Sequence, residues 1–270
     1  MRAYVINLAR SPERRMAMIA QLTKYGVDYE IIEAIDGRQL DLTDEQTIAS
    51  IAPSFLAADW FLPTHAACAL SHLSVYRRVL ADGLDHALVL EDDVLVPADL
   101  GLLAEVVAEN LLGAEVALLN FDSEQRITMT RVGAKDLPSG HQLVVPVGAD
   151  SPVSAAAYVI TKAACERMVA HALPIQAKSD NWAYFRAERI IDRIRCVVPL
   201  AVTKNPNFGS TIGYYSEDSF RGRLIGLVGR RHLRLAERVL AYRRQLIMRR
   251  YTRVMFVDDP AATLPARDGS

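Results

Sequence analysis

The chain has few cysteines, no excess of charge of either sign and no long apolar run. Cys68, Cys165 and Cys196 are the three cysteines among 270 residues, and they match neither a zinc-ligand spacing nor a disulfide framework, which favours a reducing compartment. The 31 basic and 32 acidic side chains give no general case for nucleic-acid binding. The apolar start, residues 1–8, is too short for a signal sequence, and no later run could span a bilayer. We therefore expect a cytoplasmic protein of one large domain, with or without an appendage.

Strand and helix patterns alternate along most of the chain. Residues 3–8 read as a strand, Ser11-Pro12-Glu13 as a helix start, and residues 29–32 as a second strand. This β-α-β opening predicts a parallel pair with a right-handed crossover. Further strands are expected at 87–90, 116–121, 155–160 and 196–198, helices at 63–78, 102–112, 161–170 and from 180, and a hairpin or irregular loop at 126–148. The pattern predicts an α/β fold with a mainly parallel central sheet flanked by helices.

Three consecutive acids, Glu91-Asp92-Asp93, follow the apolar run 87–90. Such a run is typical of an interior strand, and charges at its end cannot stay buried without a partner. In open α/β sheets the carboxyl ends of strands are where ligands bind. A hard divalent cation bridging to a diphosphate is one interpretation. The alternative is an acidic turn that leads into the next helix through Asp99.

Polar residues also follow the first two expected strands. Asn7, Arg10 and Arg14 come after the first strand, and Asp36 comes after the second. In a parallel sheet these residues and the acidic triplet would line one crevice. Arginine forks suit a diphosphate, and an acid after the second strand suits a ribose hydroxyl. The glycine-rich fingerprints of dinucleotide sites and P-loops are absent, so the pattern favours a nucleotide-sugar enzyme over a dehydrogenase or kinase.

The segment 220–253 differs in composition from the rest of the chain. It carries eleven arginines and one acid, Glu237, with leucines and valines recurring between them. This pattern is typical of a basic amphipathic helix on an anionic membrane surface, although a helix docked on the core or a contact with a second subunit would also fit. We therefore divide the chain into a catalytic domain at 1–218, a basic helical extension at 219–256 and a disordered tail at 257–270.

Several short motifs, taken in order, resemble glycosyltransferase family 25, the lipopolysaccharide and lipooligosaccharide biosynthesis glycosyltransferases, which are related to the procollagen galactosyltransferases. They are YVINL at 4–8, RSPERR at 10–15, EAIDG at 33–37, CALSH at 68–72, LVLEDDV at 88–94, AAYVIT at 156–161 and STI at 210–212. Each is weak alone, but together they cover most of residues 1–213 in the family's order.

The resemblance implies a GT-A-like nucleotide-diphospho-sugar transferase fold and inverting transfer from a UDP-sugar, commonly UDP-galactose. It implies Mn²⁺ (or Mg²⁺) held by Asp93 and, second, by Glu91, so that the metal neutralises charge on the departing UDP. The residues that we assign to donor binding are Asn7, Arg10, Arg14, Asp36, His72 and Asp92. As a lone histidine, His72 could instead only anchor a loop.

Inverting transfer also needs a base for the acceptor hydroxyl. Asp180 is the first candidate, because the family tends to place an acid before a helix in this region; its alternative role is the N-cap of the helix at Trp182. Asp122 is the second candidate, together with Glu124, and both could instead contact donor or acceptor sugar.

The chain departs from the family pattern at residues 64–67. The family usually has Gly-Glu-Ile-Gly before its cysteine, whereas this chain has Thr64-His65-Ala66-Ala67. His65 could alter sugar choice or signal a weakened site. His65 and His72 are seven residues apart, which could place them on one helix face, but no third ligand stands near them in the sequence and we predict no zinc site.

We expect an enzyme that extends a lipopolysaccharide or other cell-surface glycan on a glycolipid acceptor, at the inner face of a bacterial plasma membrane. One alternative is a non-catalytic member that binds nucleotide-sugar or glycan. Another is a sugar-nucleotide nucleotidyltransferase, against which the missing glycine-rich opening counts. Nucleic acid is not expected as a partner, because the basic segment has almost no aromatic residues for base stacking.

Overall fold

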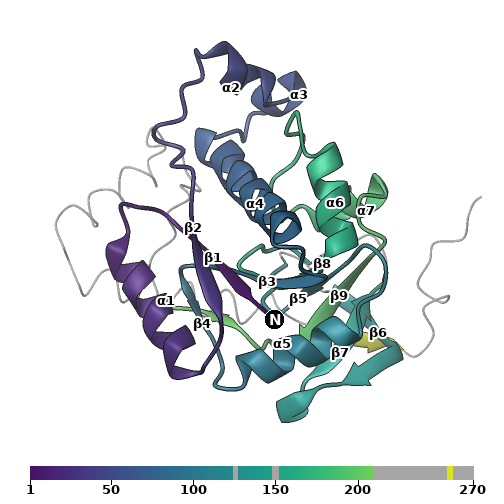
Figure 1. Cartoon of the computed structure of the whole chain (residues 1–270). Helices are drawn as coiled ribbons and strands as arrows, with labels where there is room; N and C mark the ends of the chain where they lie inside the picture. The colour runs from purple at the N-terminus through teal and green to yellow at the C-terminus, as the bar shows by residue number, and fades with distance from the viewer. Residues whose placement is uncertain (124–126, 148–151, 209–253, 258–270) are drawn as a thin grey trace, which may run out of the picture.

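The computed structural model describes residues 1–123, 127–147, 152–208 and 254–257. Within these ranges the chain forms a nine-stranded sheet covered by helices on both faces (Figure 1), in the order β11-β6-β7-β9-β5-β8-β3-β1-β2. The strands are β1 (Ala3–Asn7), β2 (Tyr29–Glu33), β3 (His86–Glu91), β5 (Glu115–Leu118), β6 (Ile127–Asp136), β7 (Gln142–Pro146), β8 (Ala157–Thr161), β9 (Arg193–Val198) and β11 (Val254–Val257).

The opening β-α-β unit is confirmed. Helix α1 (Pro12–Lys24) begins at Pro12 after Ser11, although the Ser11 side chain makes no capping hydrogen bond. It ends at Lys24 with Tyr25 as its C-cap, and Gly26 follows with a φ of 68°, a conformation that glycine adopts without strain. Strand β1 pairs in parallel with both β2 and β3. The carboxyl ends of these three strands therefore lie at one edge of the sheet.

The sheet is mostly parallel, as predicted. Strands β2, β1, β3, β5, β9, β6 and β11 share one direction, whereas β7 and β8 run the opposite way. Strand β8 is antiparallel to both of its neighbours, β3 and β5. The amino end of β8 consequently lies at the same edge as the carboxyl ends of β1 and β3.

Two apolar layers hold helices against the sheet. On one face α4 (Pro63–Ala81) and α6 (Lys162–His171) pack on alternate strand residues such as Tyr4, Val89 and Tyr158. On the other face α1 and α5 (Leu100–Glu109) cover the intervening residues, such as Val5 and Leu90. This alternation follows from the two-residue repeat of a strand. Helix α6 begins as expected, with Thr161 accepting a hydrogen bond from the backbone N–H of Ala164.

The connections complete the fold. The short helices α2 (Glu45–Ala49) and α3 (Pro53–Leu56) follow β2, and Phe55 of α3 forms a separate small core with Ile51, Ile175 and Ala66 near the start of α4. Strands β6 and β7 form the expected hairpin, and α7 (Trp182–Ala187) precedes β9. Strand β4 (Val94–Leu95) pairs antiparallel with β10 (Thr203–Lys204). This small sheet brings residues 203–208 next to the acidic triplet.

The expected C-terminal helical extension is described only at its end. Val254–Val257 form β11, which pairs in parallel with β6. These four residues are therefore a strand, where the sequence suggested the end of a helix and the start of a tail, because the β-branched and aromatic run VMFV suits a sheet edge. The arginine-rich segment and the tail after residue 257 lie outside the described residues. None of the described helices has the length and apolar character needed to cross a bilayer.

Candidate active site

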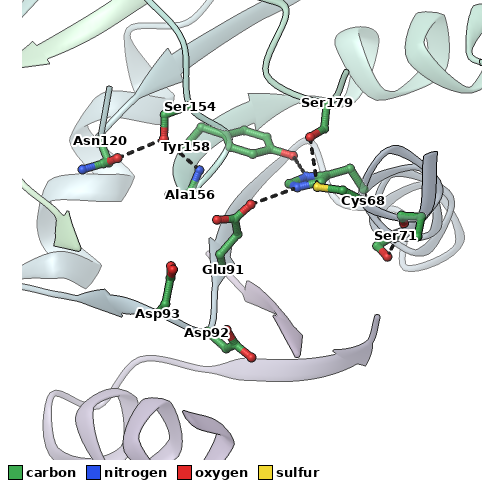
Figure 2. A network of polar contacts seen from close by, with 12 residues as sticks. Cys68, Ser71, Glu91, Asp92, Asp93, Asn120, Ser154, Ala156, Tyr158 and Ser179 are labelled. Carbon is green, nitrogen blue, oxygen red and sulfur yellow. Dashed lines mark hydrogen bonds and ion pairs between the residues drawn. The ribbon is translucent and has the colours of Figure 1, made fainter. Parts of the chain in front are cut away.

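The acidic triplet lies at the carboxyl end of β3, as predicted. Glu91 is the last residue of the strand, and Asp92 and Asp93 form the turn that leads into β4. Figure 2 shows the side chains of Glu91 and Asp92 pointing away from each other. Asp92 and Asp93 are buried, with 7% and 8% of their surface exposed, and Glu91 is partly exposed. The triplet does not cap a helix: Asp99 occupies the N-cap position of α5, and its side chain caps nothing there.

Asp92 binds two of the predicted donor-binding residues. Its Oδ2 accepts a hydrogen bond from Asn7 Nδ2 at 2.7 Å, and its Oδ1 forms an ion pair with Arg14 Nη1 at 3.0 Å. Arg14 is buried, and its guanidinium also lies 5.4 Å from the centre of the Phe208 ring. The charge of Arg14 is thus matched inside the protein. This buried group joins the end of β1 and the start of α1 to the end of β3.

Arg10 and Asp36 form a second pair at the same edge. Arg10 Nε lies 2.6 Å from Asp36 Oδ2, and Asp36 also accepts a hydrogen bond from the backbone N–H of Arg38. Partial burial would raise the pKa of Asp36, but the hydrogen bonds from Arg38 and Arg10 outweigh it and lower the pKa. Arg10 is exposed and Asp36 is half-buried, so this pair is open to solvent beside the triplet.

Glu91 lies between a histidine and a lysine. Its Oε1 is 3.7 Å from His72 Nε2, and its Oε2 is 3.7 Å from Lys204 Nζ. Burial would raise the pKa of Glu91, but the neighbouring His72 ring and the charge of Lys204 lower it to about 2. Burial would lower the pKa of His72, but Cys68 and Glu91 raise it to about 9. Glu91 is therefore a carboxylate at neutral pH.

Asp93 is the least satisfied member of the triplet. Its Oδ2 lies 3.9 Å from Lys204 Nζ, while its Oδ1 is buried and has no hydrogen-bond partner among the described residues. Burial raises the pKa of Asp93, and the charges of Glu91 and Asp92 add to the shift. A buried carboxylate oxygen without a partner is costly, and a cation would relieve that cost. The Lys204 ammonium lies within 4 Å of both Glu91 and Asp93, so a positive charge can approach both carboxylates. Carboxylate oxygens are also the donors that a hard divalent metal prefers.

Asp180 lies close enough to Glu91 and His72 for their charges to act on its carboxylate. The N-cap of α7 is Asn181, whose side chain accepts a hydrogen bond from the Tyr184 N–H, so Asp180 does not cap the helix. Burial raises the pKa of Asp180, and the negative charge of Glu91 raises it further. Both the position and the pKa are those of a group able to accept a proton.

Asp122 has a more structural setting. Its backbone N–H and C=O both bond to Val153 in a short antiparallel bridge, and its carboxylate accepts a hydrogen bond from the Ser123 N–H. Glu124 lies outside the described residues.

Sequence reasoning missed the residues that the reversed strand β8 brings to the site. The Ser154 hydroxyl donates to Asn120 Oδ1 at 2.9 Å and accepts from the Ala156 N–H at 3.2 Å (Figure 2). The φ of Ser154 is 121°, a strained value for a residue with a side chain. Tyr158 bonds to His72 Nδ1 through its hydroxyl at 2.8 Å. Tyr158 lies in the AAYVIT motif at 156–161, but the sequence pattern indicated no role for it at the site, because its proximity depends on the direction of β8.

His65, the departure from the family pattern, has a clear structural role. It is the third residue of α4, and its Nδ1 accepts a hydrogen bond from the Leu62 N–H at 3.2 Å. An acid three residues after the N-cap makes the same contact in a capping box. Histidine therefore replaces the family's usual glutamate at the start of the helix while keeping the cap. The ring is buried beside Trp60, and burial lowers the pKa of His65 to about 4.

Three relatives align with parts of the chain. The "Probable inactive glycosyltransferase 25 family member 3" of Bos taurus is 31% identical over 117 residues, which are 40% of this chain and 20% of the relative. The "Lacto-N-neotetraose biosynthesis glycosyltransferase LgtB" of Neisseria meningitidis serogroup B is 30% identical over 97 residues, 36% of this chain and 34% of the relative. Human "Procollagen galactosyltransferase 2" is 32% identical over 95 residues, 34% of this chain and 15% of the relative. The alignments thus span about a third or less of each relative.

The family comparison covers much more of the chain. Residues 1–183 match the family described as "Glycosyltransferase family 25 (LPS biosynthesis protein)". That range contains the β-α-β opening, α4, the acidic triplet and Asp180. The fold, the strand-end acids and this match agree, and the chain belongs to glycosyltransferase family 25.

Proposed function

We propose that this protein transfers a hexose, with galactose the first candidate, from a UDP-sugar to a glycan acceptor with inversion at the anomeric carbon. The observation that supports this most directly is the buried Asp93 carboxylate, which has an oxygen without a hydrogen-bond partner among the described residues, at the sheet edge where the carboxyl ends of β1, β2 and β3 meet. The relative from Neisseria is named for lacto-N-neotetraose biosynthesis, and the human relative is named a galactosyltransferase.

Asp93 and Glu91 would hold the metal, Mn²⁺ or Mg²⁺. When bound, a hard divalent cation supplies Lewis-acid stabilisation of the diphosphate leaving group. Glu91 is ionised at neutral pH because His72 and Lys204 stabilise its charge, so it can act as a ligand without first losing a proton. Arg10, exposed and hydrogen-bonded to Asp36, would contact the donor phosphates or ribose. Asp92, Asn7 and Arg14 would keep this edge rigid through their buried bonds.

Asp180 would act as the base. Its raised pKa makes it a better proton acceptor than an exposed aspartate, and it lies near enough to Glu91 for the two charges to interact. The acceptor hydroxyl would lose its proton to the Asp180 carboxylate while its oxygen attacks the anomeric carbon and UDP leaves. We expect Asp180→Asn to lower turnover by about 10² to 10⁴-fold while retaining UDP binding.

A second candidate function is binding of the nucleotide-sugar or glycan without turnover. The bovine relative is named as probably inactive, and residues 64–67 differ from the family pattern. The capping role of His65 counts against this alternative, because the substitution keeps the helix start that positions Cys68 and His72. We also propose localisation at the inner membrane face, from the arginine-rich composition of residues 220–253, which lie outside the described residues.

The decisive experiment is a UDP-release screen. Purified protein is given UDP-galactose, UDP-glucose, UDP-N-acetylglucosamine or UDP-N-acetylgalactosamine, each with Mn²⁺ or with chelator. The matched variants are Asp93→Asn and, as a control, Asp85→Asn, an exposed aspartate near the opposite end of β3. Metal-dependent release that survives in Asp85→Asn and is lost in Asp93→Asn supports the transferase. UDP binding without release from any donor supports the non-catalytic alternative, and absence of both rejects the site.

A further inference from the structure

Cys68 and His72 lie one turn apart on α4 and face the end of β3. Residues four apart share a helix face, so both side chains reach the same side. One ligand atom from each of Cys68, His72 and Glu91 lies within 4.8 Å of the other two. Figure 2 shows Cys68 beside Ser179, with Glu91 directed toward this part of α4 from the strand below. The fold thus assembles a sulfur, a nitrogen and an oxygen that are separated by up to 23 residues in sequence.

The His72 ring is oriented by a hydrogen-bond chain. Its Nδ1 lies 2.8 Å from the Tyr158 hydroxyl, which is 2.9 Å from the Tyr76 hydroxyl. When Nδ1–H donates to Tyr158, Nε2 is directed toward Cys68 and Glu91, and it can bind a metal once its proton has left. Metal-bound histidines usually have their second ring nitrogen held in this way by an oxygen.

The Nε2 atom faces Glu91 at ion-pair distance but makes no hydrogen bond within the described residues. His72 is 1% exposed, and Nε2 has no hydrogen-bond partner among the described residues. Glu91 Oε1 lies 3.7 Å away, too far for a good hydrogen bond. A buried ring nitrogen without a partner carries a desolvation cost that a ligand would remove. This orphaned atom indicates a ligand and is independent of the clustering itself.

We propose that Cys68, His72 and Glu91 bind a zinc ion at a site distinct from, but overlapping with, the metal site of the transferase. Thiolate, imidazole and carboxylate together select a borderline-soft metal of this kind, whereas an all-oxygen set selects Mn²⁺ or Mg²⁺. Three protein ligands leave a fourth position, and Cys68 is partly exposed, so the site is accessible from solvent. On binding, the Cys68 thiol and the His72 Nε2–H each release a proton to solvent, and the sulfur–zinc and nitrogen–zinc bonds form with no change of oxidation state.

Glu91 is a ligand in both proposed metal sites, so zinc binding should affect the metal of the transferase. The Glu91 carboxylate cannot bind two cations as strongly as it binds one. Zinc bound by Glu91 therefore weakens the binding of the transferase metal at Asp93. Zinc therefore inhibits metal-dependent turnover. This inhibition rests on the proposed function, whereas the binding of zinc does not.

Cobalt tests the binding directly, because Co²⁺ substitutes for zinc and reports its ligands by absorbance. The chelator-treated full chain is titrated with Co²⁺, and we expect a thiolate-to-cobalt charge-transfer band in the near ultraviolet that Zn²⁺ abolishes. Cys68→Ser should lose the band and weaken Zn²⁺ binding at least tenfold. Tyr158→Phe, which leaves all three ligands, should weaken it by about tenfold. Cys165→Ser, which removes a buried thiol outside the cluster, should keep the band.

The outcomes separate cleanly. No band in the wild-type chain, or a band that persists in Cys68→Ser, overturns the site, and circular dichroism confirms that each variant is folded. Zinc X-ray absorption provides a second reading, with one sulfur at about 2.3 Å expected among nitrogen and oxygen neighbours. In the UDP-release assay, micromolar Zn²⁺ should inhibit the wild-type protein and inhibit Cys68→Ser at least tenfold less. Absence of UDP release altogether would reject the proposed function and leave the cobalt result standing.

Discussion

Two groups of buried charges lie at opposite ends of the same sheet, and they are satisfied to very different degrees. At the start of β5, Glu115 accepts from Arg195 Nε at 2.8 Å and from the Leu112 N–H, and Arg193 lies 3.7 Å from its other oxygen. At the end of β3, Asp93 Oδ1 and His72 Nε2 have no hydrogen-bond partner within the described ranges. Both groups are desolvated, but only the first is complete. The difference separates charges that hold the fold from charges that await a ligand.

The largest effect should come from breaking the complete group. Arg195→Met would remove the cation that bonds directly to the buried Glu115. Of its two ion-pair partners among the described residues, Glu115 would keep the half-exposed Arg193, which lies 3.7 Å away. We expect a loss of about 3–5 kcal/mol in the free energy of unfolding, measured by urea denaturation. The double variant Arg195→Met/Glu115→Gln should recover part of this loss. A loss below about 1 kcal/mol would show that this pair is not structurally required.

The second comparison lies within the triplet itself. Asp92→Asn removes the ion partner of the buried Arg14 and should destabilise the fold by about 2–4 kcal/mol. Asp93→Asn removes a buried charge that lacks a full set of partners, so stability should stay the same or rise by about 1 kcal/mol, while metal-dependent UDP release falls at least about 10²-fold. Equal destabilisation by both variants would remove the distinction between the two residues.

A smaller effect is expected from pH. The pKa of His65 is lowered by burial to about 4, so between about pH 4 and 6.5 the unfolded chain binds a proton that the folded chain does not. Stability therefore falls as pH decreases through this window. His65→Gln should flatten that part of the curve of melting temperature against pH, with the largest difference in slope from wild type near pH 5. Parallel curves for the two proteins would contradict a buried, neutral His65.

The smallest effect concerns the lysine beside the triplet. Lys204→Met removes positive charge 3.7 Å from Glu91 and 3.9 Å from Asp93. Because Lys204 is about half exposed and screened by water, we expect Mn²⁺ to bind only about three- to tenfold more tightly, as measured by calorimetry. Arg38→Met, which removes an exposed cation at the same edge and keeps the backbone N–H that donates to Asp36, serves as the control and should leave Mn²⁺ affinity within twofold. Weaker Mn²⁺ binding in Lys204→Met would mean that Lys204 supports the metal rather than competing with it.

Local patterns predicted most of the fold. Ser11-Pro12 and Thr161 marked helix starts, and apolar runs marked β1, β3 and β8, because these signals act over a few residues. The direction of β8 could not be predicted, since it depends on how the chain crosses the sheet between distant elements. The residues that β8 brings to the site, Ser154 and Tyr158, were missed for the same reason.

The placement of the candidate site was predicted better than the roles of its residues. Parallel topology correctly grouped Asn7, Asp36 and the triplet at one edge. Sequence alone could not tell that Arg14 is already matched by Asp92, because a ligand-binding arginine and an internal ion pair have the same local pattern. From the sequence, His65 and His72 were considered together because they could share a helix face. In the structure His72 instead lies close to Cys68 and Glu91.

The reversed direction of β8 has a consequence for insertions and deletions. Tyr158 and Ile160 face α4 and α6, and Ala157 and Val159 face the opposite layer. One residue added inside β8 would exchange these faces and turn Tyr158 away from His72. The same residue added to the connection before β8 would leave the strand in place. Related chains that keep this site should therefore vary in length before Ser154 and stay constant between Ala156 and Thr161.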